Sequence, residues 1–380
     1  QQQQQQQESS SSHPGLCHMY IHLSEMSANP SRALPCCDQL RKGFPHGGHL
    51  IHMATHIDVL VGDYDSCVQY NYNAVAADDH AMKSCPSMMG KSAFYFGYIV
   101  HDYHMLVYGG ILGGMEQIAM ETALKLSQQH LSEDFFAKHP SMAPGLESYS
   151  VSEAHVMIRF GRWKEILQQL ELPKDADLML FRAATITFAR GIAYANLGEL
   201  ENAKKEADKY DELRLRPATK ERTLHNNKIH DILAVDAPML RGEIAYHEGR
   251  HDEAFTLLRE AVHLQDSLHY DEPWGKMQAV RHALGGLLLE QGIVKEAEDV
   301  FRKDLSLFPL NPFGLLGLIQ CLQRQINNNT GSLTEEETNA KSEELKKLKE
   351  QLAHQRSSKW ADVEIVVPCA CCDSKLVQQE

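Results

Sequence analysis

A short phrase that recurs along the chain constrains its fold more than any other feature of the sequence. The phrase reads G-x-x-x-E-A or a close variant, and apolar residues at helical spacing follow it. Its clearest copies are GELENAKKEADKY (residues 198–210), GRHDEAFTLLREAVHL (249–264) and GIVKEAEDVFRKDLSLFP (292–309), with weaker copies from Gly62 and Gly161. An amphipathic stretch precedes each copy, so every unit predicts a pair of helices. One pair cannot bury its apolar face alone, so the pairs must stack.

Small residues predict how the two helices of each unit approach each other. A glycine inside the first helix, such as Gly285, allows close packing, and a glycine after it, such as Gly249, supplies the turn. One position in the second helix packs back against the first helix, and Phe301 fills the space between units. Aligned on that position, the units are centred on Ala33, Cys67, Ala119, Ile166, Ala203, Ala254 and Ala297.

The spacing of the units indicates the type of repeat. Ala33 and Cys67 lie 34 residues apart, which is the period of the tetratricopeptide repeat (TPR). We therefore predict an all-α fold over residues 13–325. It is a TPR-type α-solenoid, in which about seven to eight antiparallel helix hairpins stack into a right-handed superhelix.

Three further segments flank this solenoid in the sequence. Residues 1–12 are a low-complexity polar run, which predicts a disordered tail. Residues 326–357 predict a polar linker or capping helix, because the helical part is polar nearly all round. Residues 358–380 predict a C-terminal tail that docks through ADVEIVV and carries Cys369, Cys371 and Cys372. These thiols offer a soft-metal or redox site, but no second cysteine pair lies nearby to complete a zinc ribbon.

Composition excludes several classes of partner. The formal charge of −14 and the lack of a dense Lys/Arg run argue against nucleic acid. The sequence has no run of about 18 apolar residues, so no membrane span is expected. The nine cysteines are irregularly spaced, which favours a cytoplasmic protein over a secreted disulfide framework. Because residue 1 is Gln, we expect a longer parent protein, whose start could carry a targeting signal.

Histidines recur at helix positions that line the concave groove in TPR proteins, to which these repeats are similar. Those positions are the second, fifth, ninth, twelfth and thirteenth of a repeat, and the first three share one helix face. They hold His18 and His22 in the first hairpin, His49, His52 and His56 in the second, His101 and His104 in the third, and His155 and Arg159 in the fourth. Stacked hairpins place equivalent positions roughly 10 Å apart, so side chains from neighbouring hairpins can converge.

Histidines at i and i+4 on one helix suit a transition metal such as Zn, Fe or Cu. We expect the metal ligands to be His18, His22, His52, His56 and His104, with Glu25, Asp58, Asp63 and Asp102 as candidate carboxylates. Two alternatives stay open: a polar ligand-binding groove without metal, and histidines that only pack. The HEXXH pattern of conventional zinc proteases is absent from the sequence.

A second group of polar residues lies in the later hairpins. Glu243 falls on a groove position, and Trp274 and Arg281 lie near a helix start in HYDEPWGKMQAVRHALG (269–285). We expect either a loop and helix cap, with Trp274 packed on the solenoid, or a groove rim that holds a ligand. The sequence contains no Gly-rich phosphate loop, nucleophile elbow or Rossmann fingerprint.

Beyond the generic repeat, the chain resembles a family of uncharacterised TPR proteins from bacteria and algae. The resemblance covers roughly residues 13–325 and is carried by HPGLCHMYIH (13–22), PHGGHLIHMATHI (45–57), HDYHML (101–106), RFGRW (159–163) and YDEPW with VRHALG (270–285). Members of that family usually have Pro-Ser in place of Ala54 and Thr55, and Asn in place of Asp102, whereas the histidines match. The resemblance implies the TPR fold and further N-terminal repeats, but no activity.

These observations favour a binding scaffold over an enzyme. We expect the His-lined groove to bind a protein, a peptide or a small polar ligand. The alternative is a metalloprotein or metal-dependent enzyme that uses the groove histidines. Binding of acidic C-terminal tails is disfavoured, because TPR grooves of that type carry Lys, Arg and Asn where this chain has His. Ring nitrogens within about 4 Å of a common point would favour the metal.

Overall fold

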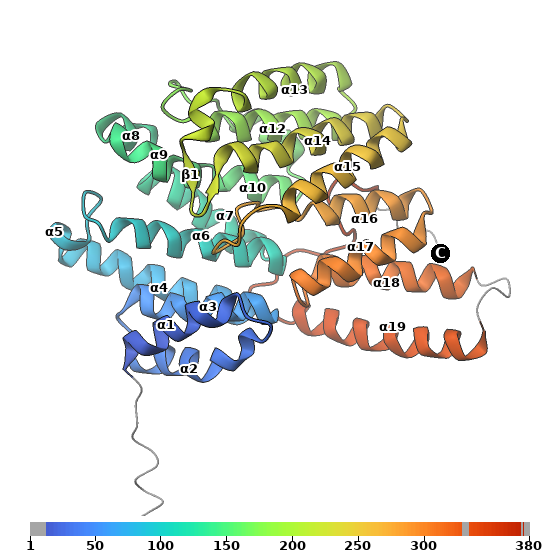
Figure 1. Ribbon diagram of the computed structural model, residues 1–380, viewed down its shortest axis with the longest axis horizontal. Helices are drawn as coiled ribbons and strands as arrows, with labels where there is room; N and C mark the ends of the chain where they lie inside the picture. Colours follow the sequence, from blue (N-terminus) through green and yellow to red (C-terminus); the bar gives the residue numbers. More distant parts are fainter. Residues whose placement is uncertain (1–12, 329–333, 374, 376–380) are drawn as a thin grey trace, which may run out of the picture. The chain divides into compact units, whose positions relative to one another are not determined.

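The computed structural model describes residues 13–328, 334–373 and 375, and almost every element in it is an α-helix (Figure 1). The predicted all-α class is therefore confirmed. The predicted disordered tail at residues 1–12 lies outside the described residues. The chain divides into two compact units, Gln1–Leu106 (unit 1) and Val107–Glu380 (unit 2), and the boundary falls inside helix α6.

Unit 1 contains five helices and the first part of a sixth. In chain order its elements are α1 (Pro14–Glu25), the 3-10 turn η1 (Pro30–Ala33), α2 (Leu34–Gly43), α3 (Gly48–Val61), α4 (Tyr64–Ser84), α5 (Pro86–Met89) and α6 (Phe96–Gly113). Helix α3 packs along α4 and also contacts α1 and α2. The core between α1, α2 and α3 is formed by apolar side chains such as Ile21, Leu40 and Ile57, which are fully buried.

Unit 2 begins with short elements and continues with long helix pairs. Its first elements are α7 (Glu116–Leu124), the π-helical η2 (Lys125–His130), α8 (Glu133–Lys138), η3 (Pro140–Met142), α9 (Ala143–Leu146), η4 (Glu147–Val151), α10 (Ser152–Arg159) and α11 (Trp163–Gln169). The longer helices are α12 (Leu180–Asn196), α13 (Leu200–Arg214), α14 (Ile229–His247), α15 (His251–Asp266), α16 (Val280–Glu290), α17 (Val294–Leu307), α18 (Pro312–Asn327) and α19 (Glu335–Arg356). Between α13 and α14 lie the turn η5 (Pro217–Lys220) and an antiparallel pair, β1 (Thr223–Leu224) and β2 (Asn227–Lys228).

Consecutive helices pack as hairpins, as the recurring phrase predicts. The pairs α3–α4, α12–α13, α14–α15 and α16–α17 each share an extended contact. All seven positions used to align the units have an exposed fraction of 0%: Ala33, Cys67, Ala119, Ile166, Ala203, Ala254 and Ala297. The alignment therefore identified, in every unit, a residue that the helix packing buries completely. The TPR type and the right-handed superhelix stay predictions.

Two glycines show why the units need small residues at fixed places. Gly249, which ends the α14–α15 turn, has φ +79°, in the left-handed region that favours glycine. Gly285 of α16 packs against the ring of Phe301 on α17, and a Cβ atom added there would lie 2.7 Å from that ring. The ring of Phe301 also packs against Gly317 of α18, so it fills the space between one hairpin and the next, as predicted. Among the described residues, no helix has both the length and the apolar character needed to cross a lipid bilayer.

A buried carboxylate joins the last three helices of unit 2. Glu298 of α17 accepts hydrogen bonds from Arg302 and from Gln325 of α18, and it lies 3.8 Å from the ammonium group of Lys341 on α19. Burial alone would raise the pKa of Glu298. The hydrogen bonds from Gln325 and Arg302, together with the Lys341 charge, outweigh burial and lower this pKa to about 2.

We expect Glu298→Gln to make the stability of the protein less sensitive to acid. The folded-state pKa of about 2 lies below the ordinary value of 4.5. Ionised Glu298 therefore stabilises the fold above about pH 4.5, and this contribution is lost as the pH falls toward about 2. Urea unfolding at a series of pH values across that window should show a smaller loss of unfolding free energy in the variant.

The matched control is Glu296→Gln. Glu296 lies on α17, as Glu298 does, and forms an exposed ion pair with Arg259 of α15. This control should leave the pH dependence of the unfolding free energy unchanged. Equal pH dependence in the wild type and Glu298→Gln would contradict the assigned role of the buried carboxylate.

Candidate metal centre

Six histidines of unit 1 form one cluster of imidazole rings. They come from α1, α3 and α6, and neighbouring rings have centroids 4.5–5.5 Å apart: His18, His22, His49, His52, His56 and His101. The i, i+4 spacing within α1 and the i, i+3, i+7 spacing within α3 keep the rings of each helix on one face. Four of the five predicted metal ligands, His18, His22, His52 and His56, belong to this six-histidine cluster.

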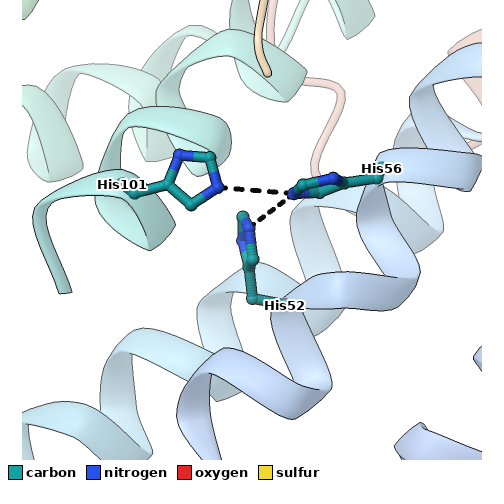
Figure 2. A group of neighbouring side chains, drawn as sticks. All are labelled: His52, His56 and His101. Carbon is teal, nitrogen blue, oxygen red and sulfur yellow. Dashed lines mark hydrogen bonds between the residues drawn. The ribbon is translucent and has the colours of Figure 1, made fainter. Parts of the chain in front are cut away.

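Three members of the cluster lie deepest and point at one another. The exposed fractions of His52, His56 and His101 are 0%, 1% and 9%. The Nε2 atom of His56 lies 2.8 Å from Nε2 of His52 and 3.4 Å from Nε2 of His101 (Figure 2). One ring nitrogen from each of the three residues lies within 4.8 Å of the others, a separation at which a single metal ion can be held.

The outer nitrogens of two of these rings are held by other side chains. His52 Nδ1 lies 2.8 Å from the amide oxygen of Asn71, and the amide nitrogen of Asn71 donates to the carbonyl of Cys67, which fixes the direction of the amide. His56 Nδ1 lies 2.9 Å from a carboxylate oxygen of Glu25. Both outer nitrogens therefore act as N–H donors, and this hydrogen-bond network assigns each neutral ring an unprotonated Nε2 atom.

This tautomer assignment directs two lone pairs at each other across the shortest contact of the cluster. Two bare Nε2 atoms 2.8 Å apart repel unless a proton or a metal ion lies between them. A proton on Nε2 of His52 is disfavoured, because burial, followed by the charges of His56 and His49, holds the pKa of His52 well below its ordinary value. At the outer part of the cluster, burial and His49 also lower the pKa of His18, to about 4.

A pair of buried carboxyl groups borders the cluster. The Asp102 carboxyl oxygen lies 3.2 Å from His49 Nδ1 and 3.4 Å from His52 Nδ1. Asp78 donates a hydrogen bond to Asp102, and burial together with the Asp102 charge raises the pKa of Asp78 to about 9. A proton shared by two buried aspartates keeps their combined charge low.

The structure changes the set of predicted ligands. His52 and His56 converge as predicted, but the third member of the inner group is His101, whereas His104 belongs to none of the ligand groups among the described residues. His101 and His104 lie one turn apart on α6, and only the tertiary packing decides which of them faces α3. His18 and His22 lie farther out, with their Nε2 atoms 3.1 Å apart, and His22 Nδ1 lies 3.1 Å from Glu25.

Two of the four candidate carboxylates belong to the histidine cluster, and the other two make contacts elsewhere. Glu25 contacts both His22 and His56, and Asp102 borders His49 and His52, so both belong to the cluster. Asp58 instead forms an ion pair with Arg41, and Asp63 caps the N-terminus of α4 by accepting from Ser66 N. Asp58 and Asp63 therefore belong to none of the ligand groups among the described residues.

Sequence reasoning missed Asn71, which orients His52. It lies on α4, the second helix of its hairpin, and that helix was considered only for packing. The available signal is its place in the helix: Asn71 follows the fully buried Cys67 by one turn, so an amide occupies a position that faces the core. A buried amide needs a partner, and the partner is the imidazole of His52.

The remaining predicted site residues lie in unit 2 and do not join one site. His155 bonds to Gln278, Arg159 to His282 Nδ1, and Arg281 to Asp266. Trp274 packs against Tyr108 and Phe308, so its predicted packing role fits the structure better than the groove-rim alternative. Glu243 accepts a hydrogen bond from the Cys371 thiol of the tail.

Comparison with models of known protein families gave no match, and no curated protein matched the chain significantly. The function is therefore argued from the geometry of the site.

We expect the metal-free protein to contain neutral His52 with its proton on Nδ1 near neutral pH. Asn71→Leu removes the acceptor and should shift His52 toward the Nε2–H tautomer, because a proton on Nε2 can then bond to His56. Long-range ¹H–¹⁵N spectra of the histidine rings distinguish the two tautomers.

Asn73→Leu is the matched control, because Asn73 lies on the exposed side of the same helix and bonds to Gln69. It should leave the tautomer of His52 unchanged. An Nε2–H tautomer in the wild-type protein would refute the assignment of opposed lone pairs.

Proposed function

We propose that unit 1 is a transition-metal centre whose ligands are His52, His56 and His101. The observation that supports it is the 2.8 Å approach of two Nε2 atoms in rings whose outer nitrogens are held by Asn71 and Glu25. A bound cation removes the repulsion between these lone pairs and uses both as ligands. Histidine ligands of metals commonly donate their other ring N–H to a carboxylate or an amide oxygen, as here.

The chemistry of the donors limits the metal. The inner group offers neutral imidazole nitrogen and no thiolate, which suits Zn, Fe or Cu rather than Mg or Ca. Two nitrogens bound to one tetrahedral zinc at about 2.0–2.1 Å are separated by about 3.4 Å. The His56–His101 separation of 3.4 Å already has this value, and the His52–His56 separation of 2.8 Å must open slightly.

A site with three histidines has a reactive form. Three protein ligands leave a fourth position for water, and a zinc-bound water ionises near neutral pH, which makes it a nucleophile for hydration or hydrolysis. This chemistry supports the metalloprotein alternative, including a metal-dependent enzyme, over a groove that only binds.

Elemental analysis of protein purified without an affinity tag tests this proposal. We expect about one transition-metal ion per chain, because the three inner nitrogens form one site. The metal should be lost in His52→Ala/His56→Ala, because one imidazole remains. The matched control is His80→Ala, which removes an exposed histidine of the same unit.

A metal content near zero, with no uptake of Zn, Fe or Cu on titration, would refute the metal centre. Equal metal content in the double variant and in His80→Ala would also refute it. Either result would leave the histidines as a polar groove or as packing residues.

A second function, peptide binding, is favoured by one observation in unit 2. Residues 361–366 of the tail are mostly irregular, residues 367–373 bend and turn, and the segment contacts the start of α7 and the helices α16 and α18. The Asp362 carboxylate accepts from Glu116 N and Gln117 N, the main-chain carbonyl of Val366 accepts from Gln320, and Asp373 N donates to Glu290. We propose that this surface is a scaffold that recognises an extended peptide, with the tail as its intramolecular ligand.

Cleavage of the folded full-length chain tests this second proposal. A protease site inserted at residues 358–360 separates the tail without removing it. The cut tail should stay bound during gel filtration and should exchange with a labelled peptide of residues 361–373, because its contacts do not depend on the covalent link. A scrambled peptide is the control. Immediate release of the tail without peptide uptake would contradict a peptide-binding surface.

A further inference from the structure

A cavity of about 370 Å³ is lined by residues of unit 2, and none of them belongs to the histidine cluster. The tail segment 363–367 lines it, and so do Arg159, Trp163 and Phe313. Its volume is near the lower end of the range for small-molecule sites, about 300–1,000 Å³. The lining is mainly apolar and aromatic, with one buried cation, which is the composition of a site for a small ligand with a single charged group.

Arg159 is a buried charge without a carboxylate partner in the described part of the chain. Its exposed fraction is 5%. One guanidinium nitrogen donates to His282 Nδ1 at 2.6 Å, and the face of the group packs on the Phe313 ring at 4.1 Å. Its Nε atom is buried and has no hydrogen-bond partner. A buried cation that lacks a paired anion is costly, so an anion that enters this cavity is stabilised.

No neighbouring carboxylate forms an ion pair with the Arg159 guanidinium group in the described part of the chain. His282 donates from Nε2 to Asp304 at 2.9 Å, so the Asp304 carboxylate bonds to histidine and not to Arg159. The hydrogen bond from Cys371, together with the Arg159 charge, outweighs burial and lowers the pKa of the Cys369 thiol in the tail. No described hydrogen bond links that thiol to the guanidinium group.

The tail wall supplies further donors. The main-chain N–H groups of Val363, Glu364, Ile365 and Val367 donate no hydrogen bond within the described residues. Main-chain N–H groups and an arginine are the usual partners of a carboxylate. Glu116 and Glu364 also line the cavity and repel a second negative charge. The ligand is therefore a monoanion.

We propose that this cavity binds a monocarboxylate with an apolar or aromatic body, with Arg159 as the anchor of the carboxylate. The aromatic rings of Trp163 and Phe313 contact the body of the ligand. This chemistry occurs in free small acids and in the C-terminal residue of a peptide. The site is independent of the metal centre proposed for unit 1, so either can fail without the other.

Calorimetric titration of the full-length protein with 3-phenylpropionate and with its neutral amide tests the proposal. We expect the acid to bind at least about tenfold more tightly, because hydrogen bonds to a charged group are stronger than those to a neutral amide. Arg159→Gln should abolish the preference, whereas Arg190→Gln, a change at a partly exposed arginine of α12, should retain it. A second pair, an acetylated peptide that ends in Phe with a free or an amidated C-terminus, distinguishes a peptide ligand from a free acid.

Val367→Phe fills the cavity from the tail side and keeps the test decisive if Arg159→Gln does not fold. This variant should lose binding of the acid while Arg159 is unchanged. The proposal is overturned if the wild-type protein binds no acid of either pair, or if it binds acid and amide equally.

Discussion

Each long helix of this chain has one apolar face that must be covered by the next helix. The seven aligned positions, from Ala33 to Ala297, are fully buried because the two helices of a hairpin meet there. Phe301 shows the same constraint from the other side, since its ring occupies the space left by Gly285 and Gly317. All other features rest on this close stacking of hairpins.

Stacking also explains why polar groups accumulate on one helix face in unit 1. A face that lies against two neighbouring helices is removed from water, so each polar side chain on it needs a protein partner. His52 and His56 meet this need with Asn71 and Glu25 on the outside, which leaves unprotonated nitrogens inside. Burial then disfavours the imidazolium form of His52. Burial in the core thus keeps the His52 imidazole neutral, and a neutral imidazole nitrogen can bind a metal cation.

Unit 2 uses its stacked helices differently. The start of α7 and the helices α16 and α18 bind the chain's own tail, and Arg159 lies buried beside that tail without a carboxylate partner among the described residues. The metal site proposed in unit 1 and the carboxylate site proposed in unit 2 therefore have opposite electrostatic character. The first attracts a cation through lone pairs, and the second attracts an anion through an uncompensated guanidinium group.

The sequence by itself determined the all-α class, the hairpin register and the helix faces that carry histidine, because these follow from local periodicity and from glycine and alanine at fixed offsets. Periodicity also placed His52 and His56 on one face. Only the tertiary structure decided that His101 joins them and His104 does not, that Asn71 orients His52, and that Asp58 belongs to Arg41. Those outcomes depend on how neighbouring helices rotate and approach, which long-range packing sets and no local pattern records.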